Sequence, residues 1–473
     1  GLWSRRKVWG KREGPPVTNI ARDRAAIILA AGKGTRMKSD LPKVMHPVGG
    51  RPMVDWSIDL ARRVGCSRIV VIAHPSQTML IEHVTAQLGE GAVAFQDPPQ
   101  GTGHAVRCAE TALDGFVGDL VVLYGDSPLV PASAIEDLYA ALETGASLCV
   151  LGFESAEPGL YGRLILAKDG DLDAIVEARE ATPEQLAVRL CNSGVMAGRA
   201  ETMFRLLGKV TNQNAKGEYY LTDLVGLARA EGAICRAVQC GEDDLIGCDS
   251  KADLAEAESI FQAQRRIAAL AAGVTLVAPD TVFFSHDTVL EADVLVEPNV
   301  VFGPGVNVQG GARIRAFSHL EGALVAAGCE IGPYARLRPG TVLEAGVRVG
   351  NFVETKNTHM GEGAKANHLA YLGDGRIGAQ ANIGAGTIFC NYDGFLKHQT
   401  TVGEGAFIGS NSSLVAPVEI GKGAIVGSGS VITKNVEPDA LAVARGQLVK
   451  REGWAISFRS RKSAEKATMK KKD

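Results

Sequence analysis

A six-residue repeat in the second half of the chain constrains the fold more than any other feature. After Gly273, aliphatic residues recur every sixth position over long runs. These runs are Val294, Val300 and Val306; Val325, Ile331, Leu337, Leu343 and Val349; and Val402, Ile408, Leu414, Ile420, Val426 and Ile432. One inward aliphatic residue per hexad makes one flat face of a triangular coil, and glycine permits the corner turns. The repeat, with 56 glycines and only 5% aromatic residues, predicts a parallel β-helix.

The six-residue step is interrupted twice, at 354–376 and at 389–401. Insertions into a solenoid form loops on one face, which is often the binding face. We therefore expect two loops in these places, with the polar chemistry of this half gathered in or beside them.

The first half of the chain has a different hydrophobic pattern. Apolar runs at 25–30, 69–72 and 120–124 alternate with helical patterns, which indicates a parallel sheet covered on both faces. Residues 249–272 have apolar positions at helical spacing and predict one long helix, ended by Gly273. Because 473 residues exceed one core, we expect several domains. These are an α/β domain at 24–251, a linker helix at 252–272 and the β-helix at 273–456.

Both ends of the chain are basic. Residues 1–23 lack the apolar segment of a signal peptide, and we expect a disordered or cloning-derived extension. For the basic tail at 457–473, a solvated, disordered end is favoured over a nucleic-acid-binding arm. The net charge of −3 opposes a nucleic-acid partner, and no apolar run reaches the roughly 20 residues of a membrane span. Nine cysteines without a C-x-x-C pair favour a reduced, cytoplasmic protein.

A glycine-rich loop follows the first predicted strand. The string is Leu29-Ala30-Ala31-Gly32-Lys33-Gly34-Thr35-Arg36-Met37, and Leu41-Pro42-Lys43 come soon after. Small residues let a nucleotide approach the backbone, amides at a helix start can face phosphate, and Arg36 and Lys43 add positive charge. The loop is not a dinucleotide fingerprint, because Met37 replaces its third glycine, and no G-K-S/T closes a Walker A motif.

The whole string, with Pro42-Lys43, resembles the signature of sugar-1-phosphate nucleotidyltransferases. Two further segments resemble one branch of them, the N-acetylglucosamine-1-phosphate uridyltransferases. Gln96 with Gly101-Thr102-Gly103-His104 is similar to its uracil-binding stretch, in which we expect His104 to be structural. Tyr124-Gly125-Asp126 closes an apolar strand, where ligands of open α/β sheets bind. A carboxylate there suits Mg²⁺ that also holds phosphates, although Asp126 alone could cap a helix. The resemblance also implies that Gly162, Glu177 and Asn192 contact the sugar.

Asp249 departs from this resemblance, because the family usually has an asparagine there that helps to hold Mg²⁺. Asp offers a charged oxygen at the same reach, so we expect Asp249 to be a metal ligand beside Asp126. The second carboxylate should tighten Mg²⁺ in the free enzyme and repel nucleotide phosphates when metal is scarce. The alternative is that Asp249 simply caps the helix starting near Ser250, which its residue type favours equally.

A second set of polar residues lies in the repeat region. Arg338 and Lys356 precede Lys365-Ala366-Asn367-His368-Leu369-Ala370-Tyr371-Leu372-Gly373-Asp374, a string that resembles the catalytic segment of glucosamine-1-phosphate N-acetyltransferases. The resemblance implies that His368 is the general base, which suits an imidazole at neutral pH. It implies that Arg338 and Lys356 bind the sugar phosphate, and that Tyr371 and Asn382 bind the sugar. For acetyl-CoA it implies Ala385, Asn391, Tyr392, Ser410, Ser428 and Arg445, with Lys397 as a further candidate near the groove. Ser428 departs mildly from the usual alanine.

Over 25–454 the chain resembles the bifunctional bacterial N-acetylglucosamine-1-phosphate uridyltransferase / glucosamine-1-phosphate N-acetyltransferase. The implied fold is a Rossmann-like domain, a linker helix and a left-handed parallel β-helix of hexapeptide repeats. The implied reactions are acetylation of glucosamine 1-phosphate by acetyl-CoA, then uridyl transfer from UTP to N-acetylglucosamine 1-phosphate with Mg²⁺, Arg36 and Lys43. They give UDP-N-acetylglucosamine and pyrophosphate, for cell-wall and lipopolysaccharide synthesis. The implied assembly is a homotrimer.

Two alternatives remain open. One is an enzyme of the same architecture that charges another sugar or uses dTTP, which Gln96 and the His368 string oppose. The other is a non-catalytic scaffold that pairs the same two folds. Such a scaffold would be expected to lose Arg36 and Lys43, Asp126 and His368, all of which are present.

Overall fold

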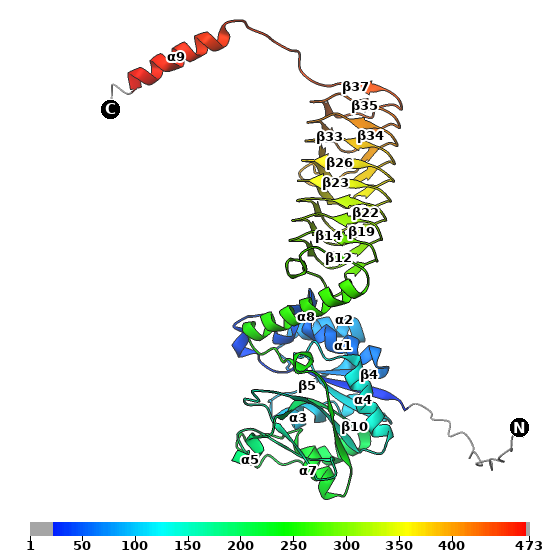
Figure 1. Cartoon of the computed structure of the whole chain (residues 1–473), viewed down its shortest axis with the longest axis vertical. Coiled ribbons are helices and arrows are strands. Elements are labelled where there is room, and N and C mark those ends of the chain that lie inside the picture. Colours follow the sequence, from blue (N-terminus) through cyan, green and yellow to red (C-terminus); the bar gives the residue numbers. More distant parts are fainter. Residues whose placement is uncertain (1–21, 470–473) are drawn as a thin grey trace, which may run out of the picture. The chain divides into compact units, whose positions relative to one another are not determined.

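The structure is a computed structural model that describes residues 22–469. The chain divides after Gln264 into two compact units (Figure 1). The expected extension at 1–23 lies outside the described residues except for Arg22 and Asp23, and so do the last four residues of the expected tail.

A nine-stranded sheet forms the centre of the first unit. Its order is β11-β7-β10-β6-β1-β4-β5, and the antiparallel pair β8 and β9 joins it at β10. The strands are β1 (Arg24–Leu29), β4 (Cys66–Ala73), β5 (Val93–Phe95), β6 (Asp119–Tyr124), β7 (Leu148–Glu154), β8 (Arg163–Leu166), β9 (Leu172–Val176), β10 (Leu190–Arg199) and β11 (Cys235–Gln239). The three predicted strands β1, β4 and β6 run parallel, as expected. β10, which the sequence did not reveal, runs antiparallel to β6 and β7.

Helices cover both faces of this sheet. The side chains of β1 alternate between two cores, with Ala26 and Ile28 in one and Ala25 and Ile27 in the other. The first core receives α1 (Met53–Arg63), α2 (Thr78–Leu88) and α4 (Ala132–Glu143). The second receives α3 (Thr102–Arg107), α6 (Ala200–Leu207) and α7 (Asp223–Ala230). A strand buried on both faces needs a continuous apolar sequence, which explains the unbroken runs.

The carboxyl ends of three neighbouring strands meet at one edge of the sheet. Leu29 at the end of β1 pairs with Tyr124 of β6 and with Ile72 of β4. The loops that follow these strands are therefore close together, and they carry the glycine-rich string, Asp126 and Gln77. Short elements complete this unit. They are η1 (Thr35–Met37), η2 (Lys43–Met45), β2 (Pro47–Val48), β3 (Arg51–Pro52), η3 (Glu90–Ala92), η4 (Thr111–Leu113), α5 (Pro183–Leu186) and η5 (Asp243–Leu245).

The long helix predicted at 249–272 is α8 (Lys251–Ala271), within which the two units divide. Its end has the two hydrogen bonds of a Schellman motif. The Val274 N–H donates to the Ala269 carbonyl at 3.0 Å, and the Gly273 N–H donates to the Leu270 carbonyl at 3.1 Å. Gly273 has a φ of 90°, so the predicted glycine stop is confirmed.

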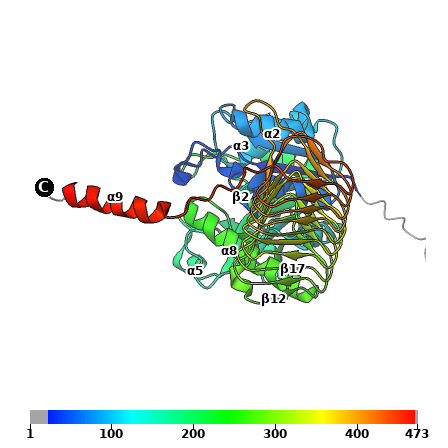
Figure 2. The same cartoon turned by 90° about the horizontal axis from the view of Figure 1, so that it is seen from above.

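The second unit is a left-handed parallel β-helix, in which each coil gives one strand to each of three sheets. Figure 2, viewed from above, shows successive coils lying over one another. One sheet contains β12 (Thr275–Leu276), β14 (Leu295–Val296), β17 (Arg313–Ile314), β20 (Glu330–Ile331), β23 (Arg348–Asn351), β26 (Lys365–His368), β29 (Asn382–Ile383), β32 (Phe407–Ile408), β35 (Ile425–Val426) and β37 (Leu441–Ala442).

The other two sheets have eight strands each. One contains β13 (Val289–Leu290), β16 (Asn307–Val308), β19 (Ala323–Val325), β22 (Thr341–Leu343), β25 (His359–Met360), β28 (Gly375–Ile377), β31 (Thr400–Val402) and β34 (Val418–Ile420). The other contains β15 (Val301–Phe302), β18 (His319–Leu320), β21 (Arg336–Leu337), β24 (Glu354–Lys356), β27 (Tyr371–Gly373), β30 (Ile388–Cys390), β33 (Ser413–Val415) and β36 (Val431–Ile432). The short helix η6 (Pro279–Thr281) lies near the start of the β-helix. The aliphatic hexad positions form its buried core, as predicted.

The two predicted interruptions have different structures. From β14 to β17 a coil takes 18 residues, since Leu295 pairs with Arg313, whereas Arg348 pairs with Lys365 after 17. The loop expected at 354–376 is therefore wrong: a coil one residue short shifts the repeat while β24 to β28 continue regularly. The loop expected at 389–401 is confirmed. Asn382 pairs with Phe407 after 25 residues, and the extra length lies between β30 and β31.

The tail also differs from expectation. It contains α9 (Trp454–Met469), so the described part of the predicted disordered end is helical. The side chains of 454–468 are exposed, as expected for a solvated segment. The helix begins inside the range predicted for the β-helix, and its Ala, Lys, Arg and Met content favours a helix over coil. Among the described residues, no helix has the length and apolar content needed to cross a membrane.

Candidate active sites

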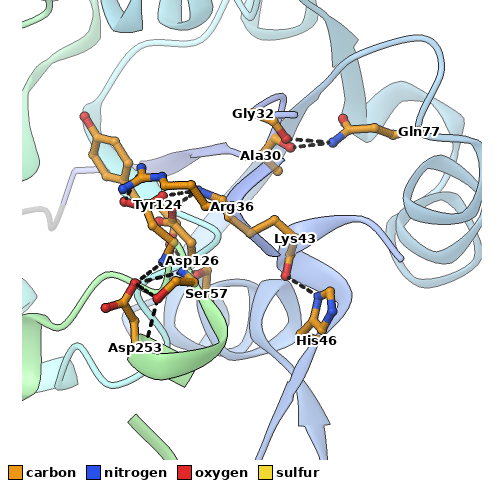
Figure 3. Close-up of polar contacts among 12 residues, drawn as sticks. Ala30, Gly32, Arg36, Lys43, His46, Ser57, Gln77, Tyr124, Asp126 and Asp253 are labelled. Atoms are coloured by element: carbon orange, nitrogen blue, oxygen red, sulfur yellow. Dashed lines mark hydrogen bonds and ion pairs between the residues drawn. The ribbon is translucent and has the colours of Figure 1, made fainter. Parts of the chain in front are cut away.

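The loop after β1 is shaped around Lys43. Gly34 has a φ of 61°, and a Cβ placed there would lie 2.7 Å from the Cβ of Lys43. Glycine is therefore required for both the turn and the close approach. Gln77, after β4, donates from Nε2 to the carbonyl oxygens of Ala30 at 3.1 Å and Gly32 at 3.3 Å (Figure 3). These contacts fix the loop at the carboxyl edge of the sheet.

Four charged side chains from remote parts of the chain form a cluster beside this loop. Lys43 Nζ lies 2.5 Å from Asp126 Oδ2 and 2.9 Å from Asp249 Oδ1. Arg36 Nη2 lies 2.9 Å from Asp249 Oδ2. Burial alone would lower the pKa of Lys43, but the two carboxylates outweigh burial and raise that pKa. Lys43 is thus held as a cation between Asp126 and Asp249.

Asp249 does not cap α8. Ser250 and Asp253 do so: the Ser250 N–H donates to Asp253 Oδ2 at 2.8 Å, and the Asp253 N–H donates to Ser250 Oγ at 3.2 Å. The helix-cap interpretation of Asp249 is therefore wrong, because its carboxylate faces Lys43 and Arg36 instead. The alternative of Asp126 as a helix cap is wrong for the same reason, since α4 begins only at Ala132 and Asp126 contacts Lys43.

A cavity of about 500 Å³ opens beside the cluster. The predicted residues that line it are Leu29, Ala30, Ala31, Gly32, Lys43, Gln96, Gly101, Thr102, Tyr124, Asp126 and Glu177. They come from the ends of β1 and β6, from the segments that follow β1, β5 and β6, and from the residue directly after β9. The structure thus brings together motifs that lie far apart in the sequence.

Gln96 lines the cavity at the end of β5, and His104 lies beside it. Gln96 is buried, and its Nε2 donates to the Gly101 carbonyl at 3.0 Å and lies 3.1 Å from His104 Nδ1. Burial, followed by the charge of Arg107, lowers the pKa of His104. A neutral imidazole that supports Gln96 fits the structural role expected for His104. Gly101 has a φ of 102°, and a Cβ there would lie 2.6 Å from the Tyr219 carbonyl oxygen.

Five predicted residues do not line the cavity itself: Arg36, Gly125, Gly162, Asn192 and Asp249. Arg36 and Asp249 belong to the charged cluster. The Gly125 N–H donates to the Leu29 carbonyl at 2.9 Å, which joins the two loops. The Asn192 N–H donates to the Gly162 carbonyl at 2.9 Å, and Asn192 Oδ1 accepts from the Gly194 N–H at 2.9 Å. Gly194 in turn packs against the ring of Tyr124, which lines the cavity, so this segment lies next to the cavity wall.

Several lining residues escaped sequence reasoning: Val44, Pro99, Ala105, Lys216, Glu218 and Tyr220. The segment that contains Lys216, Glu218 and Tyr220 is hydrogen-bonded to the Gly101 loop. The Tyr219 carbonyl accepts from the Gly103 N–H at 2.8 Å, and the Leu221 N–H donates to Thr102 Oγ1 at 3.1 Å. These contacts join segments that are remote in the chain, so the spacing of residues in the sequence does not predict them.

In the second unit, His368 is oriented by its neighbour in the preceding coil. Asn351 and His368 are paired residues of β23 and β26, and Asn351 Oδ1 lies 3.2 Å from His368 Nδ1. The amide oxygen of Asn351 only accepts hydrogen bonds, so the hydrogen of the neutral imidazole lies on Nδ1. Nε2 then has a free lone pair that can accept a proton. The side chain is exposed, so Nε2 is accessible to a substrate amine.

Three cations of the second unit lie close to one another. Arg338 Nη1 lies 2.8 Å from Glu354 Oε1. Lys397, on the inserted loop, lies close enough to Lys356 to lower the pKa of that lysine, with a smaller contribution from Arg338. Like charges held together in this way are typical of an anion-binding site.

Asn391 connects the inserted loop to the neighbouring coil. Asn391 is buried, and its Nδ2 donates to Asp374 Oδ2 at 2.6 Å and to the Tyr371 hydroxyl at 3.5 Å. Asn382 pairs with Lys365 in the strand that contains His368. Tyr392 lies on the loop with 59% of its surface exposed.

Ala385, Ser410 and Ser428 occupy equivalent corners of three successive coils. The Asn411 N–H donates to the Ala385 carbonyl at 2.7 Å, and the Gly429 N–H donates to the Ser410 carbonyl at 2.8 Å. Arg445 Nη1 donates to the Ser428 carbonyl at 2.9 Å. Four of the predicted acetyl-CoA residues, Ala385, Ser410, Ser428 and Arg445, thus form a column along one edge of the β-helix.

Comparison with known proteins agrees with both units. The family described as MobA-like NTP transferase domain matches residues 26–188, and Bacterial transferase hexapeptide (six repeats) matches 399–434. The chain is 74% identical over 451 residues to the Bifunctional protein GlmU of Hyphomonas neptunium, covering 95% of this chain and 98% of the relative. The GlmU proteins of Sphingopyxis alaskensis and Caulobacter vibrioides are each 53% identical, covering 95% and 97% of this chain and 99% and 98% of those relatives.

Sequence identity this high, over nearly the full length of each relative, shows that the chain belongs to the same family as these relatives. The alternatives of a different sugar-charging enzyme and of a non-catalytic scaffold do not fit it. The chain belongs to the bifunctional GlmU family, and it is a UDP-N-acetylglucosamine pyrophosphorylase and glucosamine-1-phosphate N-acetyltransferase.

Proposed function

We propose that the two reactions take place at two separate sites, uridyl transfer in the cavity beside Lys43 and acetyl transfer around His368. The observation that carries this proposal is the separation of two chemically distinct sets of side chains, each within its own compact unit. A partly buried cation between two carboxylates suits phosphate chemistry, and an oriented, exposed imidazole suits proton transfer.

In the uridyl transfer, UTP lies with its base against Gln96 and the Gly101 loop, and with its phosphates towards Lys43 and Arg36. Glu177 and the Asn192 segment face the sugar of N-acetylglucosamine 1-phosphate. A phosphate oxygen of this sugar attacks the α-phosphorus of UTP, and pyrophosphate leaves. The protein forms no covalent bond. Lys43 and Arg36 stabilise the charge that develops on the phosphate oxygens, and the cavity aligns the two reactants.

The donor set fits Mg²⁺. Asp126 and Asp249 both reach one ammonium nitrogen of Lys43, so their carboxylates converge on one small volume. Within residues 22–469 no group of three or more His, Cys, Asp or Glu is suited to a metal, so protein ligands alone do not form a cage. Mg²⁺ is typically held by one or two carboxylates together with substrate phosphates. Asp126 and Asp249 would hold it, and it would neutralise and orient the phosphates.

In the acetyl transfer, His368 takes a proton through Nε2 from the ammonium group of glucosamine 1-phosphate, which leaves an amine with a free lone pair. The amine nitrogen then attacks the thioester carbon of acetyl-CoA, the bond from that carbon to sulfur breaks, and the second proton lost by the nitrogen passes to the departing CoA thiolate. Asn351 keeps the imidazole in the required tautomer. Arg338, Lys356 and Lys397 bind the sugar phosphate, while Tyr371 and Asn382 bind the sugar. The column of Ala385, Ser410 and Ser428, with Asn391, Tyr392 and Arg445, receives acetyl-CoA.

We further propose domains at 24–251, 252–272 and 273–456, a homotrimer and a cytoplasmic location. The exposed column and the inserted loop support the trimer, because a neighbouring β-helix could cover them and complete the acetyl-CoA site. Nine free cysteines support a reducing compartment. Light scattering of the active protein tests the assembly, and a monomer with full acetyltransferase activity would contradict it.

One incubation tests the function as a whole. The full chain is mixed with glucosamine 1-phosphate, acetyl-CoA, UTP and Mg²⁺, and the products are identified by mass spectrometry. We expect N-acetylglucosamine 1-phosphate first, followed by UDP-N-acetylglucosamine and pyrophosphate. UDP-glucosamine without the acetylated product would contradict the proposed order.

A further inference from the structure

The carboxylate of Asp249 engages two cations at once. Its Oδ1 lies 2.9 Å from Lys43 Nζ, and its Oδ2 lies 2.9 Å from Arg36 Nη2. Lys43 is also paired with Asp126 at 2.5 Å. Both cations that are assigned to the nucleotide phosphates are therefore already paired with carboxylates (Figure 3 labels Arg36, Lys43 and Asp126).

The charges of this cluster cancel. Arg36 and Lys43 carry two positive charges, and Asp126 and Asp249 carry two negative charges, so no net positive charge awaits a triphosphate. An amide at position 249 would have the same size and would leave one net positive charge. Phosphate binding depends on such local potentials, which act strongly at a partly buried site.

The backbone holds Asp249 in place, while Arg36 is the movable partner. The Asp249 N–H donates to Asp253 Oδ2 at 3.0 Å, and the Cys248 N–H donates to the Asp126 carbonyl at 2.9 Å. These bonds fix the main chain of Asp249 next to Asp126, and from there its carboxylate reaches Lys43 and Arg36. The Arg36 side chain is 71% exposed, and that of Asp249 is 41% exposed. Solvent cations can therefore reach Asp249, and Arg36 can turn away from it.

We propose that Asp249 is a competing anion that withholds Arg36 and Lys43 from the nucleotide until a divalent cation occupies the two carboxylates. This inference rests on the proposed uridyltransferase site. When Asp126 and Asp249 hold the divalent cation, Arg36 and Lys43 are released to the phosphates. The residue thereby couples nucleotide binding to metal binding, and the coupling is reciprocal: bound UTP tightens the metal by the same factor.

The test compares the full chain with its Asp249→Asn variant, whose amide keeps the size of the side chain and removes the charge. Calorimetry measures the Kd of UTP in EDTA and in Mg²⁺. In EDTA the variant should bind UTP about 10-fold more tightly, because one negative charge near the phosphates is gone. The ratio of the two Kd values should be smaller in the variant than in the parent protein. Equal Kd values for both proteins in EDTA would overturn the proposal.

A matched control removes a charge from the same loop. Asp40 is exposed between Arg36 and Lys43 in the sequence, and Asp40→Asn should change the metal-free Kd of UTP less than about twofold. An effect as large as that of Asp249→Asn would mean that general charge is responsible, and the proposal would fail. Uridine, which has no phosphate, should bind the parent and Asp249→Asn proteins equally by NMR titration. Tighter binding of uridine by the variant would also overturn the proposal.

A double-mutant cycle tests the role of Arg36. In an Arg36→Gln background, Asp249→Asn should improve metal-free UTP binding by a smaller factor, because Asp249 then withholds one cation instead of two. An unchanged factor would contradict the pairing with Arg36. The proposed function fails in a different way: UTP would then bind none of these proteins in either buffer.

Discussion

At the scale of single residues, both sites depend on contacts that orient the reactive side chain, and in the first site such contacts also keep it charged. Lys43 is placed by Gly34, whose missing side chain makes room for it, and is kept charged by Asp126 and Asp249. His368 is turned by Asn351. The sequence identified these reactive residues, but it could not show that Asp249 pairs with Arg36. Ser250 and Asp253 cap α8, so the Asp249 carboxylate does not cap the helix and pairs with Arg36 instead.

Gly34→Ala should reduce uridyl transfer at least about 10-fold. The new Cβ would lie 2.7 Å from the Cβ of Lys43, so the lysine must shift, and a one-ångström misplacement is enough for such losses. Gly65→Ala is the matched control, because Gly65 also has a positive φ (78°) but no atom lies within 4 Å of the place that a Cβ would occupy there. Both variants should lose about 1–2 kcal/mol of stability from the left-handed conformation. Equal activity in the two variants would contradict the role of Gly34.

Asn351→Ala should lower the kcat of acetyl transfer and leave the KM for glucosamine 1-phosphate nearly unchanged. The imidazole would lose the acceptor that selects its tautomer, while the cations that bind the sugar phosphate stay in place. The loss should be smaller than that of His368→Ala, which we expect at about 10²–10⁴-fold. Steady-state kinetics measure both. A change confined to KM would show that Asn351 binds substrate instead of orienting His368.

At the scale of elements, the sequence predicted structure where the six-residue repeat is regular. It did not predict the structure where the repeat shifts along the chain. The hexads revealed the β-helix because each inward aliphatic residue is buried in one continuous core. A coil of 17 residues shifts the repeat in the same way as an insertion would, so 354–376 was misread as a loop. The strand β10 and the hydrogen bonding of Tyr219 to the Gly101 loop depend on pairing between distant segments. Local spacing contains no information about such pairing.

The inserted loop between β30 and β31 brings Lys397 to Lys356, and this leads to a prediction about substrate binding. Lys397→Ala should raise the KM for glucosamine 1-phosphate about 10-fold with a smaller effect on kcat, because a phosphate-binding cation is lost. Lys434→Ala removes an exposed cation elsewhere on the β-helix and should leave both constants unchanged. If both variants behave alike, Lys397 acts only through the general charge of the surface.

At the scale of the whole molecule, the chain joins two units whose cores do not share residues. The α/β unit places loops from β1, β4 and β6 at one edge, and the β-helix places His368 and the cations on neighbouring coils. We therefore predict that the activities separate cleanly. His368→Ala should keep uridyl transfer, and Lys43→Ala should keep acetyl transfer, each measured with its own substrate. Loss of both activities in a correctly folded single variant would place the sites elsewhere.

Mixing these two variants is the decisive experiment for two separate sites. Each is incubated alone, and then both together, with glucosamine 1-phosphate, acetyl-CoA, UTP and Mg²⁺, and UDP-N-acetylglucosamine is measured by mass spectrometry. We expect almost no product from either variant alone. The mixture should form it, because Lys43→Ala releases N-acetylglucosamine 1-phosphate for the intact uridyltransferase site of His368→Ala. Full production by one variant alone, or none by the mixture, would contradict the assignment of the two reactions to two separate sites.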